Sequence, residues 1–567
     1  MRSWNPFSTL KNAARNSPWI VMAVALHLIL IAIATVFYTT REKNVFEVKP
    51  IEVTQRPKVV EEFIPPPEIY TRDAIPESKS TELVDLDPFV RTDARESAVD
   101  IPLGDPNVTN DLPPSLAASS TAIGAGTGPG RRGFGPTPFD GRDRFPSGPG
   151  SEIGGGPLKD PLDRAVLAGL RWLARHQNED GSWGANSLNT HCDPERPCDA
   201  SKGSRIGTYD EGLTSLALLA YLGAGFSHQS QAYFKDPERG QKKVKTGDVV
   251  AAGLKWLVAQ QGADGSFGKD RPFMYNQALA TMALAEAYGL TRNRYWREPA
   301  QRAVDYLQGA QRPNPSGQGL WGWRYASRQE IERFHQGDSL DEKFRRELYD
   351  ADTSVTAWAV MALKSAQMAG LDVQQANLDG ALAFARWVSV GDGQAGYIDP
   401  KGAGAKVTGP DDQFDYHAAG MSALSMCVRA FAAHDLDDPF LEPASKRLVS
   451  DLPRISPDKL SVDYYYWYYG SLALFQFDGP DSPRARGQHW GAWNKAMQKV
   501  VPALQEQGKG CAEGGWLVPD RWCHSGGPIY ATAINVLTLE VYYRYDNAFS
   551  VGRKRHVEAP PPIQGAK

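Results

Sequence analysis

A helix-and-turn motif that recurs along the second part of the chain constrains the fold more than any other feature. Residues 169–184 form an amphipathic segment that runs through Gln177 into an Asp-Gly turn and ends on Trp183. Residues 253–268 repeat this pattern 84 positions later, with Gln261 and Phe267 in the equivalent places. A unit of this kind buries its apolar face only against its neighbours, so the sequence predicts a repeat architecture.

Segments of a second kind alternate with the motif. They begin with Tyr or Asp and continue in small and apolar residues, as in residues 213–220 and 357–363. Because a helix without a polar face is buried all round, these segments fit an inner ring and the amphipathic ones an outer ring. Six such pairs occur between Leu158 and Phe549. The predicted fold is therefore all-α, an α6/α6 toroid of twelve alternating helices.

The turn residues have structural roles in this arrangement. Glycine in the Asp-Gly turn allows a positive φ, so that each outer helix can stop there. Trp183 and Phe267 are expected to pack as wedges between neighbouring helix pairs. Gln177 and Gln261, or Gln260 beside it, are expected to hydrogen-bond free backbone groups of the next inner helix.

Composition limits the possible partners. The chain has 567 residues, 41% of them hydrophobic, and a net charge of only -4. This is enough apolar material for a large core, and the near-neutral charge argues against nucleic acid as a partner. Aromatic residues make up 10% of the chain and concentrate after residue 160, which favours aromatic wedges or an aromatic-lined site.

The N-terminal part is expected to anchor and tether the toroid. Residues 19–38 are 20 uncharged residues with His27 as the one strongly polar side chain, long enough to span a bilayer as a helix. Residues 1–18 form a cytoplasmic tail in this scheme. Residues 39–157 form a disordered periplasmic linker that is rich first in proline and then in glycine. The toroid covers residues 158–549, and residues 550–567 form a disordered tail.

Four of the five cysteines form two short-range pairs in loop-like sequence. In an oxidising compartment Cys192 with Cys198, and Cys511 with Cys523, are expected to form disulfides; in the cytosol they would be free or metal-bound. The extended tether and these pairs favour a toroid outside the cytoplasm. We therefore predict a single-pass protein of a bacterial inner membrane with its C-terminal domain in the periplasm.

The anchor resembles that of TonB-type energy transducers. The resemblance rests on the apolar run with His27, on residues 46–53 (FEVKPIEV) and on residues 61–67 (EEFIPPP). In that family the membrane-embedded His belongs to the helix that docks on a proton-driven ExbB/ExbD-type motor, so the resemblance implies such a partner and a coupling role for His27. The family's Ser four residues before the His is Ala23 here, and no TonB-like C-terminal domain follows.

The repeat domain resembles the terpene cyclase and prenyltransferase superfamily. Residues 177–183 and 261–267 are similar to its QW motif, with weaker copies at 311–321, 393–397 and 505–516. Residues 352–366 and 530–545 resemble bacterial prenyltransferase/squalene oxidase repeat proteins. The resemblance covers about 390 residues and implies the toroid fold much more than any activity.

Asp350 and Asp352 are the candidate catalytic residues. The run DADTS at 350–354 is similar to the acid motif of class II terpene cyclases, in which the residue equivalent to Asp352 protonates an alkene or epoxide. The strict third Asp of that motif is Thr353 here. A structural alternative is that Asp352 simply caps the following helix. Zinc, which a prenyltransferase needs, is not expected, because the Asp-x-Cys pattern is absent.

If all inner helices begin at one end of the toroid, their first residues line one mouth. These residues are acidic and aromatic, namely Tyr209, Asp210, Tyr275, Tyr416, His417, Asp463, Tyr464 and Tyr530. Such a rim suits an envelope polymer, a peptide or a lipid. We predict a binding or interaction module of the cell envelope without cofactor or metal. The alternative is a cyclase or transferase that acts on an isoprenoid-like substrate with Asp352 as general acid.

Overall fold

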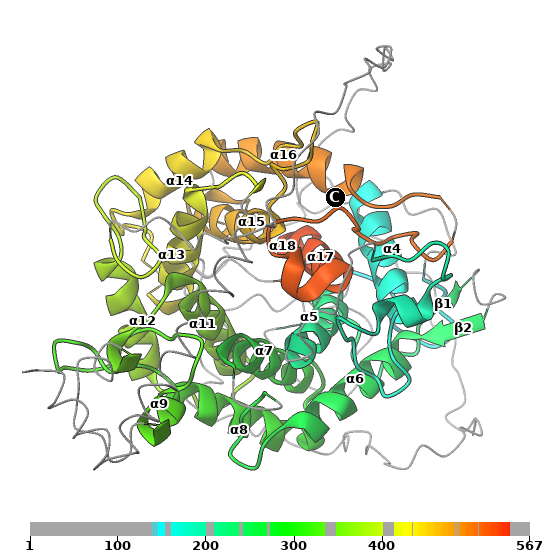
Figure 1. Cartoon of the computed structure of the whole chain (residues 1–567), viewed down its shortest axis with the longest axis horizontal. Helices are drawn as coiled ribbons and strands as arrows, with labels where there is room; N and C mark the ends of the chain where they lie inside the picture. The colour runs from blue at the N-terminus through cyan, green and yellow to red at the C-terminus, as the bar shows by residue number, and fades with distance from the viewer. Residues whose placement is uncertain are drawn as a thin grey trace, which may run out of the picture. The chain divides into compact units, whose positions relative to one another are not determined.

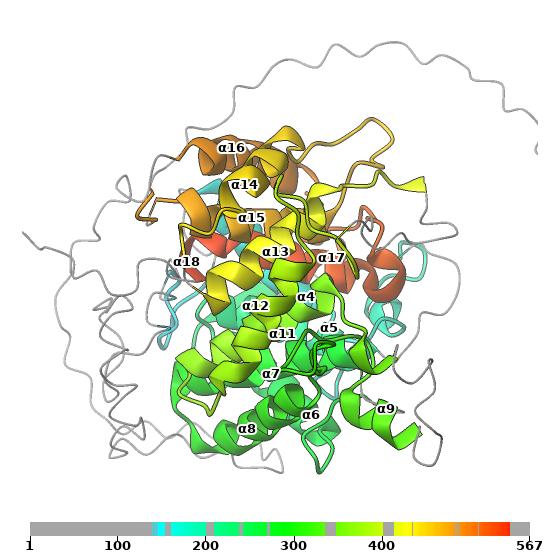
Figure 2. The same ribbon diagram turned by 90° about the vertical axis from the view of Figure 1, so that its left-hand side faces the viewer.

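The computed structural model describes one part of the chain, and all of it lies C-terminal to residue 138. The described residues are 139, 142, 144–153, 160–199, 209–236, 242–268, 273–334, 347–400, 413–433, 435–480, 482–484, 487–508 and 510–544. They form twelve long helices in alternating outer and inner positions (Figures 1 and 2).

The outer helices are α4 (Pro161–Arg175), α6 (Thr246–Gln260), α8 (Arg294–Gly309), α12 (Gln375–Trp387), α14 (Leu441–Ser450) and α16 (Gln488–Ala503). The inner helices are α5 (Asp210–Gly223), α7 (Met274–Thr291), α11 (Thr353–Met368), α13 (Ala419–Ala432), α15 (Tyr464–Asp478) and α17 (Cys523–Leu539). Each inner helix contacts the next, and α17 contacts α5, so the inner ring is closed (Figure 1). The predicted α6/α6 toroid is confirmed.

Shorter elements join the ring helices. They are η3 (Leu188–His191), α9 (Arg328–Phe334), α18 (Val541–Arg544) and an antiparallel hairpin of β1 (Tyr233–Asp236) and β2 (Lys242–Lys245). In the hairpin Tyr233 lies opposite Lys245.

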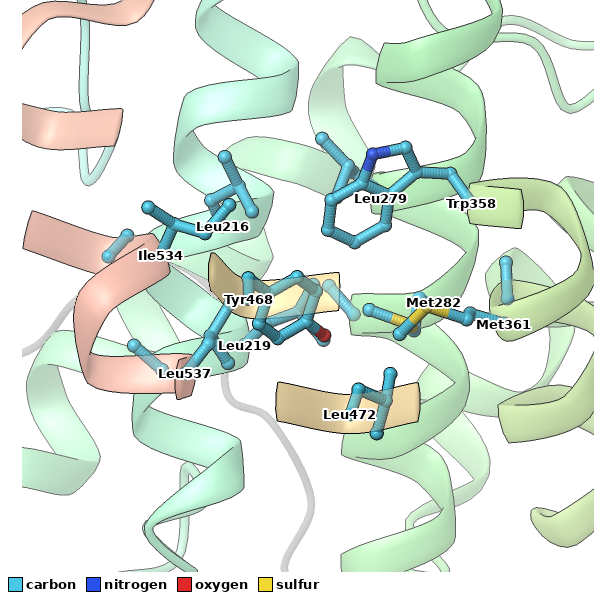
Figure 3. Packing of buried hydrophobic residues seen from close by; sticks show 14 of the residues in the cluster. Leu216, Leu219, Leu279, Met282, Trp358, Met361, Tyr468, Leu472, Ile534 and Leu537 are labelled. Carbon is cyan, nitrogen blue, oxygen red and sulfur yellow. The ribbon is translucent and has the colours of Figure 1, made fainter. Parts of the chain in front are cut away.

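Burial explains which helices are inner. Every residue of α7 except Tyr275 is buried, as expected for a helix that other helices surround on all sides. Side chains of α5, α7, α11, α15 and α17 meet inside the ring (Figure 3), where Trp358 stacks on Tyr468 with 5.7 Å between ring centroids. These apolar side chains exclude solvent from the middle of the ring. In α4, by contrast, Val166, Leu170 and Leu173 are buried on one face only.

The glutamine of the motif links consecutive outer helices. Gln177 Nε2 donates to the carbonyl of Gly181 (2.8 Å) in its own turn and to that of Val249 in α6 (3.0 Å). Gln505 repeats this from α16 with Gly514 (2.9 Å) and Ala165 of α4 (2.9 Å), which closes the outer ring. The bond to a following helix was therefore expected correctly, but its acceptor lies on the next outer helix and not on an inner one. Val249 and Ala165 lie near the starts of the outer helices α6 and α4, so their carbonyls are close to the motif that precedes each helix around the ring.

The aromatic residue of each motif is a buried wedge. Trp183 is fully buried; its indole N–H donates to Leu173 O (2.8 Å) and its backbone N–H donates to Thr214 Oγ1 (2.9 Å). Phe267 is also fully buried, as expected. In the third copy the wedge is Trp323, whose indole bonds Leu307 O (2.8 Å), and not the expected Trp321. The spacing between Gln and Trp is longer in this copy, which obscured the match.

The turn glycine is required by both conformation and space. Gly181 has φ of +95°, and a Cβ there would lie 2.4 Å from Ala252 O in α6. Gly514 has φ of +88°, and its Cβ would lie 2.3 Å from Ala168 O in α4. The turn thus lets the chain leave one outer helix while touching the backbone of the next.

The C-terminal ends of the inner helices carry a buried ion cluster, which we call the base. Glu286 of α7 lies 2.6 Å from Arg142 Nη1 and 3.0 Å from Arg544 Nη2, and all three side chains are nearly inaccessible to solvent. Burial raises the pKa of Glu286, but the two guanidinium charges outweigh it and lower that pKa to about 2. Phe139 also packs here, against Gly289. Residues 139 and 142, within the predicted linker, are thus part of the packed domain.

Candidate functional site

The starts of three inner helices meet at the end of the ring opposite the base. Tyr275 Oη near the start of α7 lies 2.7 Å from Ser354 Oγ at the start of α11. The same Ser354 oxygen lies 2.5 Å from Tyr465 Oη at the start of α15. We call this end of the ring the mouth. The expected convergence of helix starts is therefore present for α7, α11 and α15.

Asp352 caps a helix and also forms an ion pair. Its Oδ1 accepts from the backbone N–H of Val355 (2.8 Å), and its Oδ2 lies 3.2 Å from Arg324 Nη1. The side chain is fully buried, and burial raises its pKa to about 6 against the opposing effect of Arg324. Both carboxylate oxygens are thus engaged, and the helix-cap alternative describes the observed geometry.

Arg324 connects the two candidate acids. Its Nε lies 3.0 Å from Asp350 Oδ2, while its Nη1 contacts Asp352. The guanidinium also lies over two aromatic rings, 4.6 Å from the centroid of Tyr325 and 5.2 Å from that of Tyr397. Asp350 is about one third exposed, and burial raises its pKa. One cation therefore serves two carboxylates at the mouth.

Aromatic rings next to Arg324 form a continuous surface. The centroid of Phe273 lies 5.4 Å from that of Tyr209 and 5.6 Å from that of Tyr275, and the centroids of Tyr275 and Tyr325 are 6.0 Å apart. Tyr397 joins them through a hydroxyl–hydroxyl bond to Tyr325. We call these five residues the aromatic platform. Tyr325 is 37% exposed, so the platform reaches the surface.

A second group of acids lies where α15 and α17 begin. Asp463 Oδ1 caps α15 through Tyr466 N–H (2.9 Å) and accepts from Trp522 Nε1 (3.3 Å). Asp520 Oδ2 accepts from the Tyr530 hydroxyl (3.3 Å). Burial, together with the nearby charge of Asp463, raises the pKa of Asp520 to about 7. These two predicted mouth residues, Asp463 and Tyr530, therefore share one buried acidic cluster.

Other predicted mouth residues make structural contacts. Asp210 Oδ1 accepts from the N–H of Ala185 (3.1 Å). The hydroxyl of Tyr464, itself buried, donates to Val518 O (3.0 Å). Tyr416 is 36% exposed, and Arg521 lies 5.5 Å from its ring centroid.

His417 is held on both sides of its ring. Nδ1 lies 2.8 Å from Asp451 Oδ2, and Nε2 lies 3.2 Å from Ser461 O. The ring stacks on Tyr466 with centroids 5.1 Å apart. Although burial alone would lower it, hydrogen bonding to Asp451 and the negative charges nearby raise the pKa of His417. His417 thus contacts both Asp451 and Ser461 and stabilises the loop before α15.

The sequence analysis missed several residues of the mouth. Arg324 and Tyr325 lie directly after the Trp323 wedge, and Asp520 and Trp522 precede α17. The start of a helix can be found from its pattern, but these residues lie in the loops between outer and inner helices. In each loop a charged residue lies close to an aromatic one after the wedge. This pattern is too short to identify a site from the sequence alone.

The cysteines disagree with the prediction. All five are free thiols, so the predicted disulfides Cys192–Cys198 and Cys511–Cys523 are wrong. Cys523 opens α17, where its sulfur accepts from Asp520 N–H (3.4 Å). The turn after α16 instead returns Cys511 to the end of α4, near Cys192 and Cys198. For Cys511, closeness in sequence gave the wrong partner because ring closure brings the last motif against the first, whereas Cys192 and Cys198 do lie close together as thiols.

The predicted membrane span at residues 19–38, with His27, lies outside the described residues. Among the helices that the structure does describe, none combines the length and apolar character needed to cross a bilayer.

Comparison with known proteins adds only distant likenesses. The sequence matches no protein-family model and no curated protein. A type II terpene cyclase from Scytonema is similar with a TM-score of 0.41 at 13% identity, covering 67% of this chain and 97% of the cyclase. An inactive variant of an α-1,6-mannanase of Salegentibacter bound to α-1,6-mannotriose gives 0.41 at 12%, covering 69% and 99%. Cellobiose 2-epimerase from Bacillus thermoamylovorans gives 0.43 at 12%, covering 66% and 97%. Likenesses this weak assign neither an activity nor a residue role to this chain.

Proposed function

We propose that the protein is a membrane-anchored binding module of the bacterial envelope, whose toroid takes a polysaccharide at the mouth. The observation that carries the proposal is the aromatic platform, which runs from Tyr209 to Tyr325 and emerges at the surface. Ring faces of this kind offer flat apolar contact, and the hydroxyls at their edges offer hydrogen bonds.

The charges around the platform support a neutral or weakly charged ligand. Arg324 pairs with both Asp350 and Asp352, and in the loop before α13 Asp415 Oδ2 lies 2.7 Å from Arg454 Nη2. A strongly charged ligand would have to break these pairs or leave one partner uncompensated. Sugar hydroxyls can instead donate to Asp350 Oδ1 without displacing Arg324, which contacts Oδ2.

The contacts of Asp352 support binding rather than catalysis in this proposal. A general acid must present a proton to its substrate, but Oδ1 of Asp352 receives the Val355 N–H and Oδ2 faces Arg324. The cap and the ion pair both favour the ionised form. Asp352 accordingly serves in this proposal to position Arg324 under the platform.

The experiment is co-sedimentation of the full-length chain in detergent with a panel of insoluble polysaccharides, peptidoglycan sacculi among them. Tyr325→Ala should lower affinity for the polymer that binds by roughly five-fold or more, since removing an aromatic anchor costs more than about 1 kcal/mol. The matched control is Trp387→Ala, because Trp387 is a 47% exposed aromatic residue of outer helix α12. Equal retention of both variants, or no retention by the unmodified chain, would refute the proposal.

The anchor completes the proposal. We infer that residues 19–38 hold the protein in the inner membrane and that His27 couples it to an ExbB/ExbD-type motor. An imidazole in hydrocarbon is costly and is best placed against a partner. Replacing His27 by Ala should release the motor subunits in a pull-down from membranes. Unchanged co-purification would exclude the coupling and leave the binding proposal intact.

One observation favours a second candidate, an isoprenoid cyclase with Asp352 as acid. Burial raises the pKa of Asp352 to about 6, so part of the population carries a proton near neutral pH. For this candidate, Asp352→Asn should abolish turnover of a polyprenyl substrate while stability changes little, because Asn caps a helix as well as Asp does. Absence of any product from the unmodified protein would exclude it.

A further inference from the structure

Four potential metal ligands gather between the first and the last repeat. His176 follows α4 as its C-cap, Cys192 and Cys198 flank the loop after η3, and Cys511 lies in the turn after α16. One ligand atom from each, His Nε2 and three Sγ, lies within 4.8 Å of the others. His176 and Cys198 are buried, and Cys192 and Cys511 are half-buried.

The spacing of these atoms fits tetrahedral coordination. His176 Nε2 lies 3.1 Å from Cys511 Sγ, 3.5 Å from Cys192 Sγ and 3.6 Å from Cys198 Sγ. Zinc bonds of about 2.3 Å to sulfur and about 2.0 Å to nitrogen place tetrahedral ligands roughly 3.5 Å apart. A small adjustment of the side chains therefore suffices to enclose an ion.

The surroundings prepare the histidine for this role. His176 Nδ1 lies 2.8 Å from Trp172 O, so this nitrogen carries the proton and donates it to the carbonyl. The lone pair is then on Nε2, which faces the three sulfurs. The ring also stacks on Trp172 with centroids 4.1 Å apart. Metal-bound histidines commonly have their second nitrogen fixed in this way.

An arginine fixes the third thiol and offsets its charge. Arg175 Nη1 donates to Gly510 O (3.2 Å) and Cys511 O (3.0 Å), while its Nε lies 3.3 Å from Asp236 Oδ1. Three thiolates and one dication leave a net charge of minus one. The buried guanidinium next to Cys511 attracts that charge, although Asp236 shares the same guanidinium.

Two hydrogen bonds bridge the ends of the cysteine loop. Asn189 Nδ2 donates to Asp199 O (2.9 Å), and Asp199 N–H donates to Asn189 Oδ1 (3.0 Å), so the two ends of the loop are bridged. His191 Nε2 lies 2.9 Å from Asn178 Oδ1, which directs this second histidine toward the motif turn. The His191 ring, 6.3 Å from that of His176 between centroids, is therefore engaged by Asn178, while the His191 carbonyl accepts from Cys511 Sγ (3.5 Å).

We propose that His176, Cys192, Cys198 and Cys511 bind a structural zinc ion that fastens the closure of the ring. Four protein ligands without an open position are typical of structural sites, and a thiolate-rich tetrahedral set favours zinc. The ion joins residues 335 positions apart, across the junction of α16 and α4. Binding releases the thiol protons to solvent and makes closure of the ring dependent on metal.

The test is the metal content of the full-length chain, purified in detergent without added metal and measured by elemental mass spectrometry. The unmodified protein should contain about one zinc ion per chain. Cys192→Ser and Cys511→Ser should each lose most of it. The matched controls are Cys523→Ser and Cys427→Ser, since both cysteines are buried and lie outside the ligand set. Both controls should retain zinc.

Thermal unfolding is a second test, because it measures the effect of removing the metal on the stability of each protein. A strong chelator should lower the melting temperature of the unmodified chain and of Cys523→Ser, but leave that of Cys511→Ser unchanged. A cobalt-substituted protein should show the visible absorption of tetrahedral thiolate coordination. The proposal is overturned if the unmodified chain contains no zinc, if iron occupies the site instead, or if peptide mapping finds a disulfide among these three cysteines.

Discussion

The mouth and the base of the ring both bury carboxylates, but they differ in the number of cations available to each. At the base, Glu286 lies between Arg142 and Arg544, and its pKa is lowered to about 2. At the mouth, Asp352 shares Arg324 with Asp350, and its pKa is raised to about 6.

The acids that form no ion pair among the described residues complete the comparison. Asp520 at the mouth has a pKa raised to about 7 by burial and by the charge of Asp463. Glu540 at the base has no hydrogen bond among the described residues, and burial raises its pKa well above the ordinary value. The number of cations that oppose burial thus decides whether the pKa of a buried acid is lowered or raised. The base contains a buried ion cluster that stabilises the fold. The mouth contains Asp352 and Asp520, whose pKa values lie near neutral pH.

The largest effect should come from breaking the base. Glu286→Gln leaves Arg142 and Arg544 buried without their common anion, which should cost about 3–5 kcal/mol in the free energy of unfolding. Urea denaturation measures the loss. Glu298→Gln is the control, because Glu298 forms an exposed pair with Arg302 and should cost no more than about 1 kcal/mol.

The pH dependence of the base has a definite sign. Because the folded pKa of Glu286 lies below its ordinary value, its contribution is complete above the ordinary pKa and is lost as pH falls toward about 2. Glu286→Gln should therefore flatten the acid limb of the stability curve. An unchanged acid limb would show that other carboxylates dominate acid unfolding.

Asp520 should show the opposite sign. Its folded pKa of about 7 lies above the ordinary value, so the folded state holds a proton that the unfolded state releases. Stability from this group is complete below the ordinary pKa and is lost as pH rises through about 7. The stability difference between the unmodified chain and Asp520→Asn should therefore shift in favour of the variant, by more than about 1 kcal/mol, between pH of about 5 and about 8. A constant difference would contradict this prediction.

Arg324→Gln should give Asp352 a pKa closer to those of the acids that form no ion pair. Asp352 would lose its cation, and its pKa should rise further above about 6. We expect a cost of about 2 kcal/mol that grows with pH, because the ionised form becomes harder to bury. Arg454→Gln is the control, since its pair with Asp415 is exposed. A cost that did not change with pH would mean that Asp352 stays protonated in the unmodified protein.

Asp350→Asn should have the smallest effect. Asp350 is partly exposed, so the loss of its pair with Arg324 should cost less than about 1 kcal/mol. The negative charge of Asp350 contributes to the raised pKa of Asp352, and its removal should lower that pKa. Carbon-13 NMR of the labelled Asp352 carboxyl measures the shift directly. A higher pKa in the variant would reverse the assigned roles of these two acids.

Much of the fold followed from local pattern. The fully apolar segments such as residues 357–363 identified the inner helices. The Gln and Trp of the motif identified the turns that follow the outer helices. The helix-cap alternative for Asp352 also followed from its position before an apolar helix. These features depend on neighbours within one or two turns, where spacing along the chain determines spacing in the molecule.

What the sequence determined is the repeat and therefore the ring, because twelve alternating helices can bury their apolar faces only by closing on one another. The tertiary structure decided everything that depends on that closure. Ring closure places Cys511 next to Cys192, Cys198 and His176, and not next to the cysteine nearest in sequence, Cys523. The fold also places Arg324 between Asp350 and Asp352. The physical reason is that a ring brings its last repeat against its first, and no local pattern records which side chains meet at that junction.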